Sequence, residues 1–514
     1  MKIKLSAIFN QPLIKVFLFM GGLFTGILLF SFHIMGDLYG DEYGHTYKLV
    51  AAGDFWSNIR SPSMCHPPLY FMLAKISYLT VGEPWAIRIP SLVFSLGTVL
   101  LVTFTSKRIL GGRFLLSSVW LASLSAFILE FSAEGRAYAM VMFFSAATFW
   151  AFLEFVQKEN LRNMLILTAT SICGALTHYF FWFQLISVVV IYLIYKKRIT
   201  LYAAGVFAMT AAVLIPFSIF LFLIQRGEFK EFLQVGWSED YFKITNFLGR
   251  LYIAISYGFS TFRLPNLDPS RNVPVIQVVK DNIILISLAI VSFGGLVHTW
   301  IKLAVTKDRL FYICALGIFI PVILGLIAGE AGFYLIREKH LAIIWVSYFF
   351  LLLMAFEYLR TKKWGWIIIG CQITVILISV SHYIFLPNEY TRRMDWTGLT
   401  ELLERKVQRA DCVVVYQYDI EHLSLKRISI WDRGVKKINF KNTHSPGTSI
   451  SEYALSLHQS VKGTIYIVNN ETDRHFVDPD SELILTLGEL RSTSRRQFGR
   501  NLILYSFCKE KSPL

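Results

Sequence analysis

Two adjacent carboxylates, Asp41 and Glu42, follow closely on an apolar run that carries no charge from Val16 to Gly36. Carboxylates at the edge of a hydrocarbon layer lose hydration, which is costly unless a partner or a reaction uses them. Titratable groups held in such places commonly have shifted pKa values, and these suit them to proton transfer. The pair is therefore the first candidate for chemistry. Asp37 and His45 nearby are interpreted as ordinary interfacial residues.

Further ionisable side chains lie at the ends of later apolar segments and not at their middles. Charges inside a membrane are costly and are kept for a purpose in ion-coupled transporters, so this placement argues against that class. By the alternation described below, five loops bring the groups to one membrane face. This predicts a site at the lipid–water boundary, open to a lipid from the side and to a polar reactant from above. The candidates are His66, Arg88, Glu134, Arg136, His178, Arg337 and Lys339.

Each of these groups also has a plain structural explanation. The basic residues at segment ends could be anchors whose long side chains reach the interface. Glu134 and Arg136 could form a local ion pair of little consequence, and His178 could be a turn histidine with its hydrogen bonds satisfied. His66 precedes two prolines, which force extended geometry on it. Lys75 is interpreted as interfacial.

The composition indicates a membrane protein that crosses the bilayer many times. The chain has 514 residues, of which 54% are hydrophobic and 15% aromatic, and its mean hydropathy is +0.51. Lys and Arg collect on the cytoplasmic side of membrane proteins, so the net charge of +15 is not evidence for nucleic acid binding. The six cysteines are scattered, and we expect neither a disulfide framework nor a metal knuckle. The first apolar segment lacks a small-residue cleavage site, which predicts an uncleaved helix.

A transmembrane helix needs about 20 apolar residues. With the amino terminus in the cytoplasm, every short inner loop carries two or three basic residues. The segment 67–81 contains Lys75 and is predicted to lie along the outer surface. The run 164–195 is predicted to be a hairpin with His178 and Tyr179 at its outer turn. The eleven predicted spans are 16–35, 86–106, 114–131, 137–156, 163–177, 179–195, 199–224, 282–301, 309–328, 340–358 and 364–386.

The last part of the chain, 388–514, predicts a small α/β domain, because charge density rises and long apolar runs stop. Eleven spans from a cytoplasmic start place this domain outside the cytoplasm. A long loop at about 226–281, with Arg250, Arg263 and Arg271, is placed there too. The predicted strands are 411–418, 463–470, 481–494 and 501–510, and the predicted helices are 397–410 and 449–461.

Four stretches together resemble a known family. They are "GDEYGHTYKLVAAGDF", "HPPLYFMLAKI", "AIRIPSLVFSLGTVLL" and "SAEGRAYAM". Their order is similar to that of polyprenyl-phosphate-sugar-dependent glycosyltransferases with the multi-spanning GT-C fold. The likeness is greatest to the protein O-mannosyltransferases and the bacterial transferases that put aminoarabinose on lipid A. It covers roughly residues 10–360 in layout, and "TRRMDWTGLTELLE" resembles the start of the family's bacterial carboxy-terminal domains.

The resemblance implies a catalytic membrane domain over 1–387, whose first outer loop is 36–85, and an extracytoplasmic domain over 388–514. Asp41 matches the family's catalytic acid, with Glu42 as its companion. No Asp-x-Asp motif is present, so no metal site is predicted, although the residues leave a divalent cation open. No other cofactor is expected. The residues that the resemblance or their charge places near the donor phosphate are His66, Arg136, Arg337 and Lys339.

The implied reaction moves a hexosyl or pentosyl unit from a polyprenyl-phosphate donor to a hydroxyl of a lipid, glycan or protein in the cell envelope. A carboxylate whose pKa is raised by a like charge can accept the hydroxyl proton. Basic residues would stabilise the departing phosphate. Attack opposite the phosphate would invert the anomeric centre. The expected location is a bacterial inner membrane, with the site on its outer face.

Two other functions remain open at this point. A lipid-linked glycan polymerase or ligase would use a diphosphate donor and an arginine-led outer loop, and the three arginines in 226–281 keep it open. A transporter of lipid-linked sugars would share the many spans and a lipid site. It should also carry polar residues in mid-span and basic clefts open to both faces, and the sequence shows neither.

Overall fold

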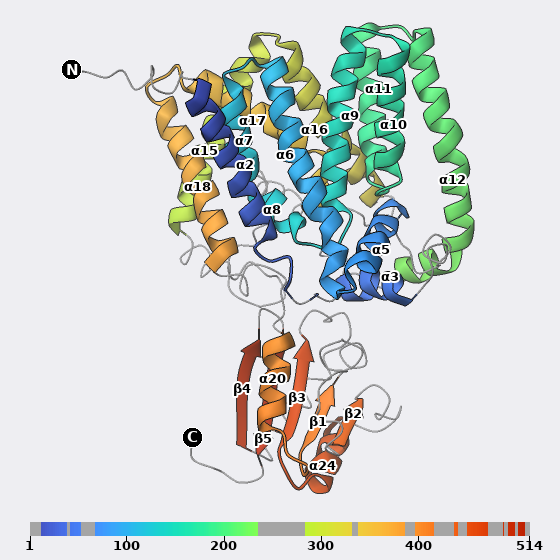
Figure 1. Cartoon of the computed structure of the whole chain (residues 1–514), viewed down its shortest axis with the longest axis vertical. Coiled ribbons are helices and arrows are strands. Elements are labelled where there is room, and N and C mark those ends of the chain that lie inside the picture. The colour runs from blue at the N-terminus through green and yellow to red at the C-terminus, as the bar shows by residue number, and fades with distance from the viewer. Residues whose placement is uncertain are drawn as a thin grey trace, which may run out of the picture. The chain divides into compact units, whose positions relative to one another are not determined.

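The structure, a computed structural model, divides into a helical unit, mostly residues up to Ile384, and a C-terminal unit, mostly Phe385–Leu514. Each unit is described by itself (Figure 1). The residues that the structure describes are 12–36, 38, 42–52, 67–234, 283–330, 338–385, 396–415, 436–439, 450–470, 487, 492–498 and 502–508. Arg250, Arg263 and Arg271 of the predicted 226–281 loop lie outside these ranges.

The helical unit contains a helix, or a pair of helices, at each of the eleven predicted spans, which confirms the expected polytopic helical architecture. Among the described residues, seven helices are long and apolar enough to cross a membrane. An eighth span results if α7 and α8, which are bent by 52° relative to each other, count as one. The elements are α2 (Pro12–Ser31), η1 (Glu42–Tyr47), α3 (Lys48–Ala52), α5 (Leu69–Val81), η2 (Pro84–Arg88), α6 (Ile89–Ile109), α7 (Phe114–Ser123), α8 (Ala126–Ser132), α9 (Tyr138–Gln157), α10 (Leu161–Ala175), α11 (Phe181–Lys196), α12 (Leu201–Gln234), α15 (Ile283–Val305), α16 (Arg309–Glu330), η5 (Glu338–Ile343), α17 (Trp345–Leu359) and α18 (Gly365–Phe385).

Three details differ from the sequence predictions. The span predicted at 114–131 is broken between α7 and α8. The span predicted to end at 224 continues as α12 to Gln234. Lys75, expected to be an interfacial residue, is buried in α5, where its ammonium group donates a hydrogen bond to the carbonyl oxygen of Val50. A lysine can be buried in this way because a charged donor finds an unpaired carbonyl at the end of a short helix.

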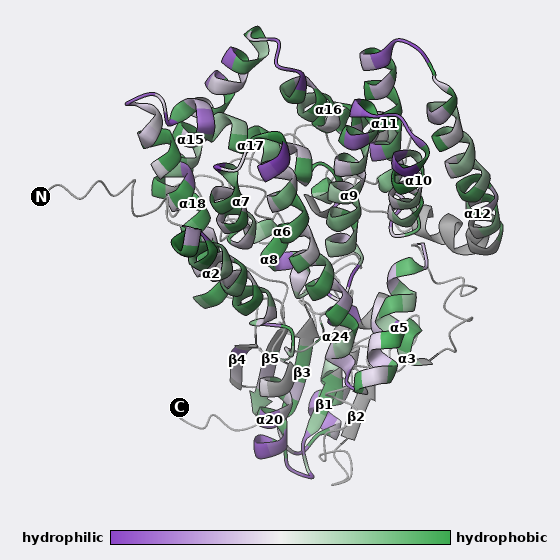
Figure 2. Ribbon diagram, turned by 45° about the horizontal axis from the view of Figure 1, so that its top comes forward, coloured by the Kyte–Doolittle hydropathy of each residue, from purple (hydrophilic) through white to green (hydrophobic). Residues whose placement is uncertain are grey.

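The centre of the helical unit is formed by α9 and α17. In the most apolar 18-residue stretch of α9, 78% of the residues are buried, whereas the corresponding share is 17% in α2 and in α12. The stacked rings of Phe149 and Phe350, with centroids 5.0 Å apart, join the two central helices. The outer helices expose large apolar side chains such as Phe17 and Phe24, and Figure 2 shows hydrophobic residues along their length. Such surfaces fit a lipid environment, where apolar side chains need no cover.

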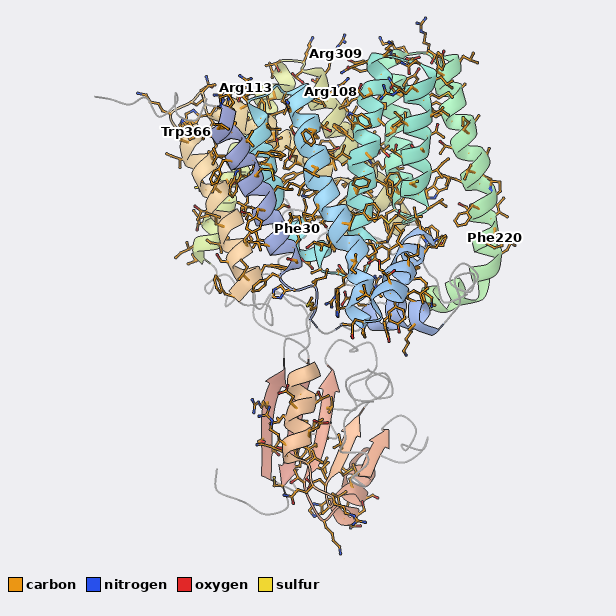
Figure 3. All side chains as sticks on the ribbon, in the orientation of Figure 1. Phe30, Arg108, Arg113, Phe220, Arg309 and Trp366 are labelled. Atoms are coloured by element: carbon orange, nitrogen blue, oxygen red, sulfur yellow. The ribbon has the colours of Figure 1, made fainter. Side chains whose placement is uncertain are left out.

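One end of the bundle, the ion-paired end, is joined by contacts between charged side chains. Arg108 in the last turn of α6 binds Glu154 of α9 at 2.5 Å, and Arg113 before α7 binds Glu357 of α17 at 2.9 Å. Figure 3 shows Arg108, Arg113 and Arg309 at this same end. The remaining links are Lys196–Glu159 at 2.9 Å and Arg309–Tyr195 at 3.0 Å. These links join short basic loops at one end of the bundle, as expected for loops that share one membrane face.

At the opposite end of the bundle, the other helix termini are linked through backbone carbonyl groups and aromatic rings. We call this the buried-charge end. It contains the end of α2, the start of α6, the α8–α9 turn, the α10–α11 turn, η5 and the end of α18. The imidazole of His33 donates to the carbonyl oxygen of Tyr383 at 3.1 Å, linking the ends of α2 and α18. The amide of Leu69 donates to the carbonyl oxygen of Leu176 at 3.1 Å, which fixes the start of α5 to the end of α10.

The C-terminal unit is a small α/β structure, as predicted. Its five-stranded sheet has the order β2-β1-β3-β5-β4, with β1 parallel to β2 and β3, and β5 antiparallel to β3 and β4. Of the strand predicted at 481–494, residues 492–494 lie in β4 and Leu487 is helical, and the other positions lie outside the described residues. The strand β2 was not predicted. Its elements are α20 (Trp396–Lys406), β1 (Cys412–Val415), β2 (Lys436–Asn439), α24 (Ile450–Ser460), β3 (Ile465–Asn470), β4 (Ser492–Phe498) and β5 (Leu502–Cys508).

Candidate functional site

Three of the predicted site residues, Asp41, His66 and Arg337, lie outside the described residues. Of Lys339 only the backbone, within η5, is described. Their roles stay predictions. Glu42 is described: it opens η1 and is fully buried.

Arg88 lies at the start of α6 and is only 2% exposed. One terminal nitrogen of its guanidinium donates to the carbonyl oxygens of Gly36, Ile34 and His33, at 2.6, 2.9 and 3.3 Å. These are carbonyls just past the end of α2, where the helix dipole is negative. Arg88 is therefore not a surface anchor. It caps α2 at the point from which the first outer loop departs.

Glu134 and Arg136 lie in the turn between α8 and α9, and both are buried, at 8% and 7% exposure. The amide of Arg136 donates to the carbonyl oxygen of Glu134 at 2.8 Å. The hydroxyl of Ser91, on α6, donates to the same carbonyl oxygen at 2.6 Å and lies 3.1 Å from that of Arg136. Tyr70 of α5 lies 2.9 Å from the Ser91 hydroxyl. The turn that bears the arginine is thus held by two other elements.

His178 lies in the α10–α11 turn, as predicted, and is 3% exposed. Its Nδ1 accepts a hydrogen bond from the amide of Phe180 at 3.2 Å, so in the neutral ring Nε2 carries the proton. The ring lies 5.5 Å from that of Tyr138 and 5.6 Å from that of His340. The guanidinium of Arg136 lies 5.8 Å from the Tyr138 ring centroid, within range of a cation–π contact.

His340 completes this cluster and was not among the predicted site residues. It lies in η5 and stacks on Phe180 at 4.0 Å between centroids, with the rings 16° apart. Arg136, Tyr138, His178 and His340 therefore converge from three loops that are far apart in sequence. We call these four residues the basic–aromatic cluster. A guanidinium and two imidazoles together can donate hydrogen bonds to an anion such as a phosphate.

An apolar groove adjoins the basic–aromatic cluster and shares His340 with it, and Phe180, which stacks on His340, also lines the groove. It is small and partly open to the surface. His340 is the one ionisable side chain in its lining. The lining comes from the start of α11, the middle of α16 and the η5–α17 segment: Phe180, Phe183, Pro321, Val322, Gly325, His340, Leu341, Ile343 and Ile344. Such a groove suits a hydrocarbon chain whose polar end meets the imidazole.

Within the described part of the chain, no three or more His, Cys, Asp or Glu side chains are grouped closely enough to hold a metal ion. The cysteines described in the structure, which exclude Cys65, are free thiols.

Comparison with known proteins bears on the same region. Residues 65–222 match the family described as dolichyl-phosphate-mannose-protein mannosyltransferase. The resemblance predicted from the sequence is confirmed. The matched segment runs from just before α5 into α12, so it contains Arg88, Glu134, Arg136 and His178. It does not reach Asp41 or Glu42.

More distant likenesses extend over the whole chain. The structures of ArnT from Cupriavidus metallidurans, in the apo state and bound to undecaprenyl phosphate, are each 14% identical to this chain. They cover 96% and 98% of it, and the alignments cover 98% and 99% of ArnT, with TM-scores of 0.42 and 0.44. At these scores the likeness carries no argument about the site. No curated protein matches the chain significantly.

Proposed function

We propose that this protein is an integral-membrane glycosyltransferase that moves a sugar from a polyprenyl-phosphate donor to a hydroxyl acceptor. The observation that carries the proposal is the junction of the apolar groove with the basic–aromatic cluster. A lipid phosphate has the same two parts, an apolar chain and an anionic head. The family match over residues 65–222 supports this donor class.

In the proposed reaction the acceptor hydroxyl oxygen attacks the anomeric carbon of the donor sugar. The bond between that carbon and the phosphate oxygen breaks, so the configuration inverts and polyprenyl phosphate leaves. Asp41 takes the hydroxyl proton as general base, and Glu42 supports it. Adjacent residues point in different directions, which favours one base and one supporting carboxylate over two equivalent bases.

The leaving phosphate gains negative charge as the bond breaks, and fixed donors nearby stabilise that charge. Arg136 and the Nε2 proton of His178 fit this task. The backbone of Arg136 is fixed in its turn, its guanidinium lies against the Tyr138 ring, and Nδ1 of His178 is bound by the amide of Phe180. We assign the prenyl chain to the groove that His340 lines. His66, Arg337 and Lys339 remain further candidates for the phosphate. Arg88, which binds three carbonyl groups, is assigned a structural task.

The orientation follows from the same proposal. Lys and Arg are retained on the cytoplasmic side, so we place the ion-paired end and the amino terminus in the cytoplasm of a bacterial cell. The buried-charge end then faces the outer surface of the inner membrane. The membrane domain is assigned to 1–387 and the extracytoplasmic domain to 388–514, in keeping with the division into two units near Phe385.

Binding of undecaprenyl phosphate to the purified protein in nanodiscs tests the donor class. Micromolar binding is expected for the wild type, at least tenfold weaker for H340A and R136A, and unchanged for R309A at the ion-paired end. Undecaprenyl diphosphate serves as the competitor. Tighter binding of the diphosphate would favour a polymerase or ligase, and equal effects of all three variants would show that the phosphate binds elsewhere.

Transfer itself tests the assignment of the base. With a polyprenyl-phosphate sugar as donor, D41N should lose transfer by about a hundredfold or more. Undecaprenyl phosphate should still bind to D41N as it does to the wild type. Retained transfer in D41N would remove Asp41 from the mechanism and would leave the donor assignment intact.

A further inference from the structure

After α2 ends, the chain turns through the residues up to Gly36 and forms helical structure again in η1 and α3. We call the stretch from Gly36 to Ala52 the outer segment. Both ends of the segment are held by buried charged residues. Arg88 binds the three carbonyl groups at the exit of α2. Lys75 donates to the carbonyl oxygen of Val50, in α3. Lys75 and Arg88 are 5% and 2% exposed.

These two cations belong to one short stretch of chain, α5 and η2, which runs from Leu69 to Arg88. That stretch is itself fixed to the rest of the bundle. The amide of Leu69 binds the end of α10, and the hydroxyl of Tyr70 donates to the carbonyl oxygen of Ile87 at 2.8 Å, tying α5 to η2. One rigid element therefore holds the outer segment at two points.

The second end of the outer segment is packed against α5. Val50 is fully buried. Tyr47 of η1 meets Tyr78 of α5 edge to face, with ring centroids 5.7 Å apart. This contact adds a third link between the outer segment and the same helix.

Burying a cation is costly unless its hydrogen bonds are made. Here both cations bind backbone carbonyl groups, and these bonds fix the course of the main chain. Fixing a catalytic loop to a rigid element is what precise chemistry requires, because a misplacement of about 1 Å can reduce a rate about a hundredfold.

We propose that Arg88 and Lys75 are positioning residues that hold the outer segment bearing Glu42 at both ends, using α5–η2 as the rigid support. The inference rests on the proposed function only in that Glu42 and its neighbour serve the reaction. The clamp itself is a property of the protein without substrate.

Hydrogen exchange of the full-length protein, in nanodiscs of phosphatidylethanolamine and phosphatidylglycerol, tests the clamp. R88M and K75M should each accelerate exchange in peptides covering 42–47 by about tenfold, because local opening becomes easier. Peptides covering 12–26, in the first part of α2, should not change. Conservative R88K should accelerate exchange less than R88M, and it serves as the variant to measure if R88M fails to fold.

Trp120→Phe is the matched control. The indole of Trp120 donates to the carbonyl oxygen of Leu18 at 3.1 Å, so W120F removes a tether from the same helix α2 at a point far from the outer loop. Exchange over 42–47 should stay at the wild-type rate in W120F. Equal acceleration in W120F, or unchanged exchange in both R88M and K75M, would overturn the proposal.

A kinetic readout separates positioning from general stability. With a polyprenyl-phosphate sugar, R88K should lower kcat about tenfold and leave KM for the donor unchanged, whereas W120F should change neither. The exchange experiment needs no substrate. If undecaprenyl phosphate fails to bind while the exchange pattern is as expected, the proposed function falls and the clamp stands; the reverse result removes the clamp alone.

Discussion

The two ends of the helical bundle carry arginines in different surroundings. At the ion-paired end, the side chains of Arg108 and Arg113 are 58% and 61% exposed, and each binds a glutamate of a neighbouring helix. At the buried-charge end, Arg88 and Arg136 are 2% and 7% exposed. Arg88 binds carbonyl groups, and Arg136 lies against an aromatic ring.

This difference in exposure and in partners indicates a separate role for the charges at each end. Exposed ion pairs contribute about 0–1 kcal/mol each, so charge at the ion-paired end is retained mainly to orient the helices in the membrane. Buried charges are kept only where they have specific partners. The loops at the buried-charge end are therefore fixed in place, and this rigidity is what a site requires.

The largest expected contrast between the two ends is in activity. R136M should reduce kcat/KM for a polyprenyl-phosphate sugar by about a hundredfold, because it removes a fixed charge from the leaving phosphate. R309M, at the ion-paired end, should change it by less than about twofold. Steady-state kinetics of both variants in the same detergent provide the measurement. Similar losses in both would mean that the arginine at the buried-charge end acts only through stability.

Stability should differ between two tyrosines in a smaller but measurable way. Y70F leaves the buried carbonyl of Ile87 without its 2.8 Å donor, and we expect a loss of about 1–3 kcal/mol in the free energy of unfolding. Y192F removes long contacts to Glu159 at 3.4 Å and to Thr200 at 3.2 Å, but the Glu159 carboxylate keeps Thr200 and Lys196, so a loss within about 0.5 kcal/mol is expected.

Thermal unfolding of both tyrosine variants, in one detergent and with wild type alongside, gives the two values. A loss for Y192F as large as that for Y70F would show that hydrogen bonds at the two ends are equally buried. The idea that only one end is rigid would then be wrong.

The sequence predicted much of this arrangement, because apolar length and the positions of Lys and Arg indicate where membrane helices lie. These two properties predicted a helix or a pair of helices at each of the eleven spans, and also the hairpin turn at His178. The basic–aromatic cluster could not be predicted in full. Tyr138, His178 and His340 are far apart along the chain, and nothing local indicates that their rings meet. The buried state of Lys75 was missed for the same reason, since its partner is a carbonyl group on another helix.

The C-terminal unit shows a second limit. Strands β1, β3 and β5 are short apolar runs and were predicted. The strand β2, Lys436–Asn439, has two lysines among four residues and is defined by pairing with β1, not by its own pattern. The assignments of Asp41, His66 and Arg337 rest on resemblance and remain predictions.

A pH-dependent contrast is expected at the ion-paired end. Partial burial works to raise the pKa of Glu159, but hydrogen bonds from Thr200, Lys196 and Tyr192 and the charge of Lys196 outweigh it and lower the pKa. A lowered pKa means that the carboxylate stabilises the fold above the unfolded-state pKa of about 4.3. This contribution is lost as the pH falls through the lower pKa of the folded state.

E159Q should therefore be less stable than the wild type at pH 7, by about 1 kcal/mol. The difference should shrink as the pH is lowered below about 4.3. Unfolding curves of both proteins across this range give the comparison. A difference that stays constant with pH would show that the glutamate acts through packing and not through its charge.

The smallest expected effect concerns two lysines whose backbones are strained. Lys197 and Lys307, which follow α11 and α15 at the ion-paired end, have φ values of 55° and 54°. Glycine is the usual residue in this left-handed conformation, because a Cβ atom makes it unfavourable. We infer that lysine is kept at both positions because its charge orients the protein in the membrane, although the backbone conformation there is unfavourable for it.

K197G and K307G should each raise the free energy of unfolding by about 0.5–1 kcal/mol. K197A is the matched control, since it removes the charge and keeps the Cβ atom, and it should give no gain. If the lysines serve orientation, the double variant K197G/K307G should be more stable as a purified protein yet insert less uniformly in cells. Protease accessibility of the C-terminal domain in spheroplasts would report that insertion, and uniform insertion would leave the two lysines without an orienting role.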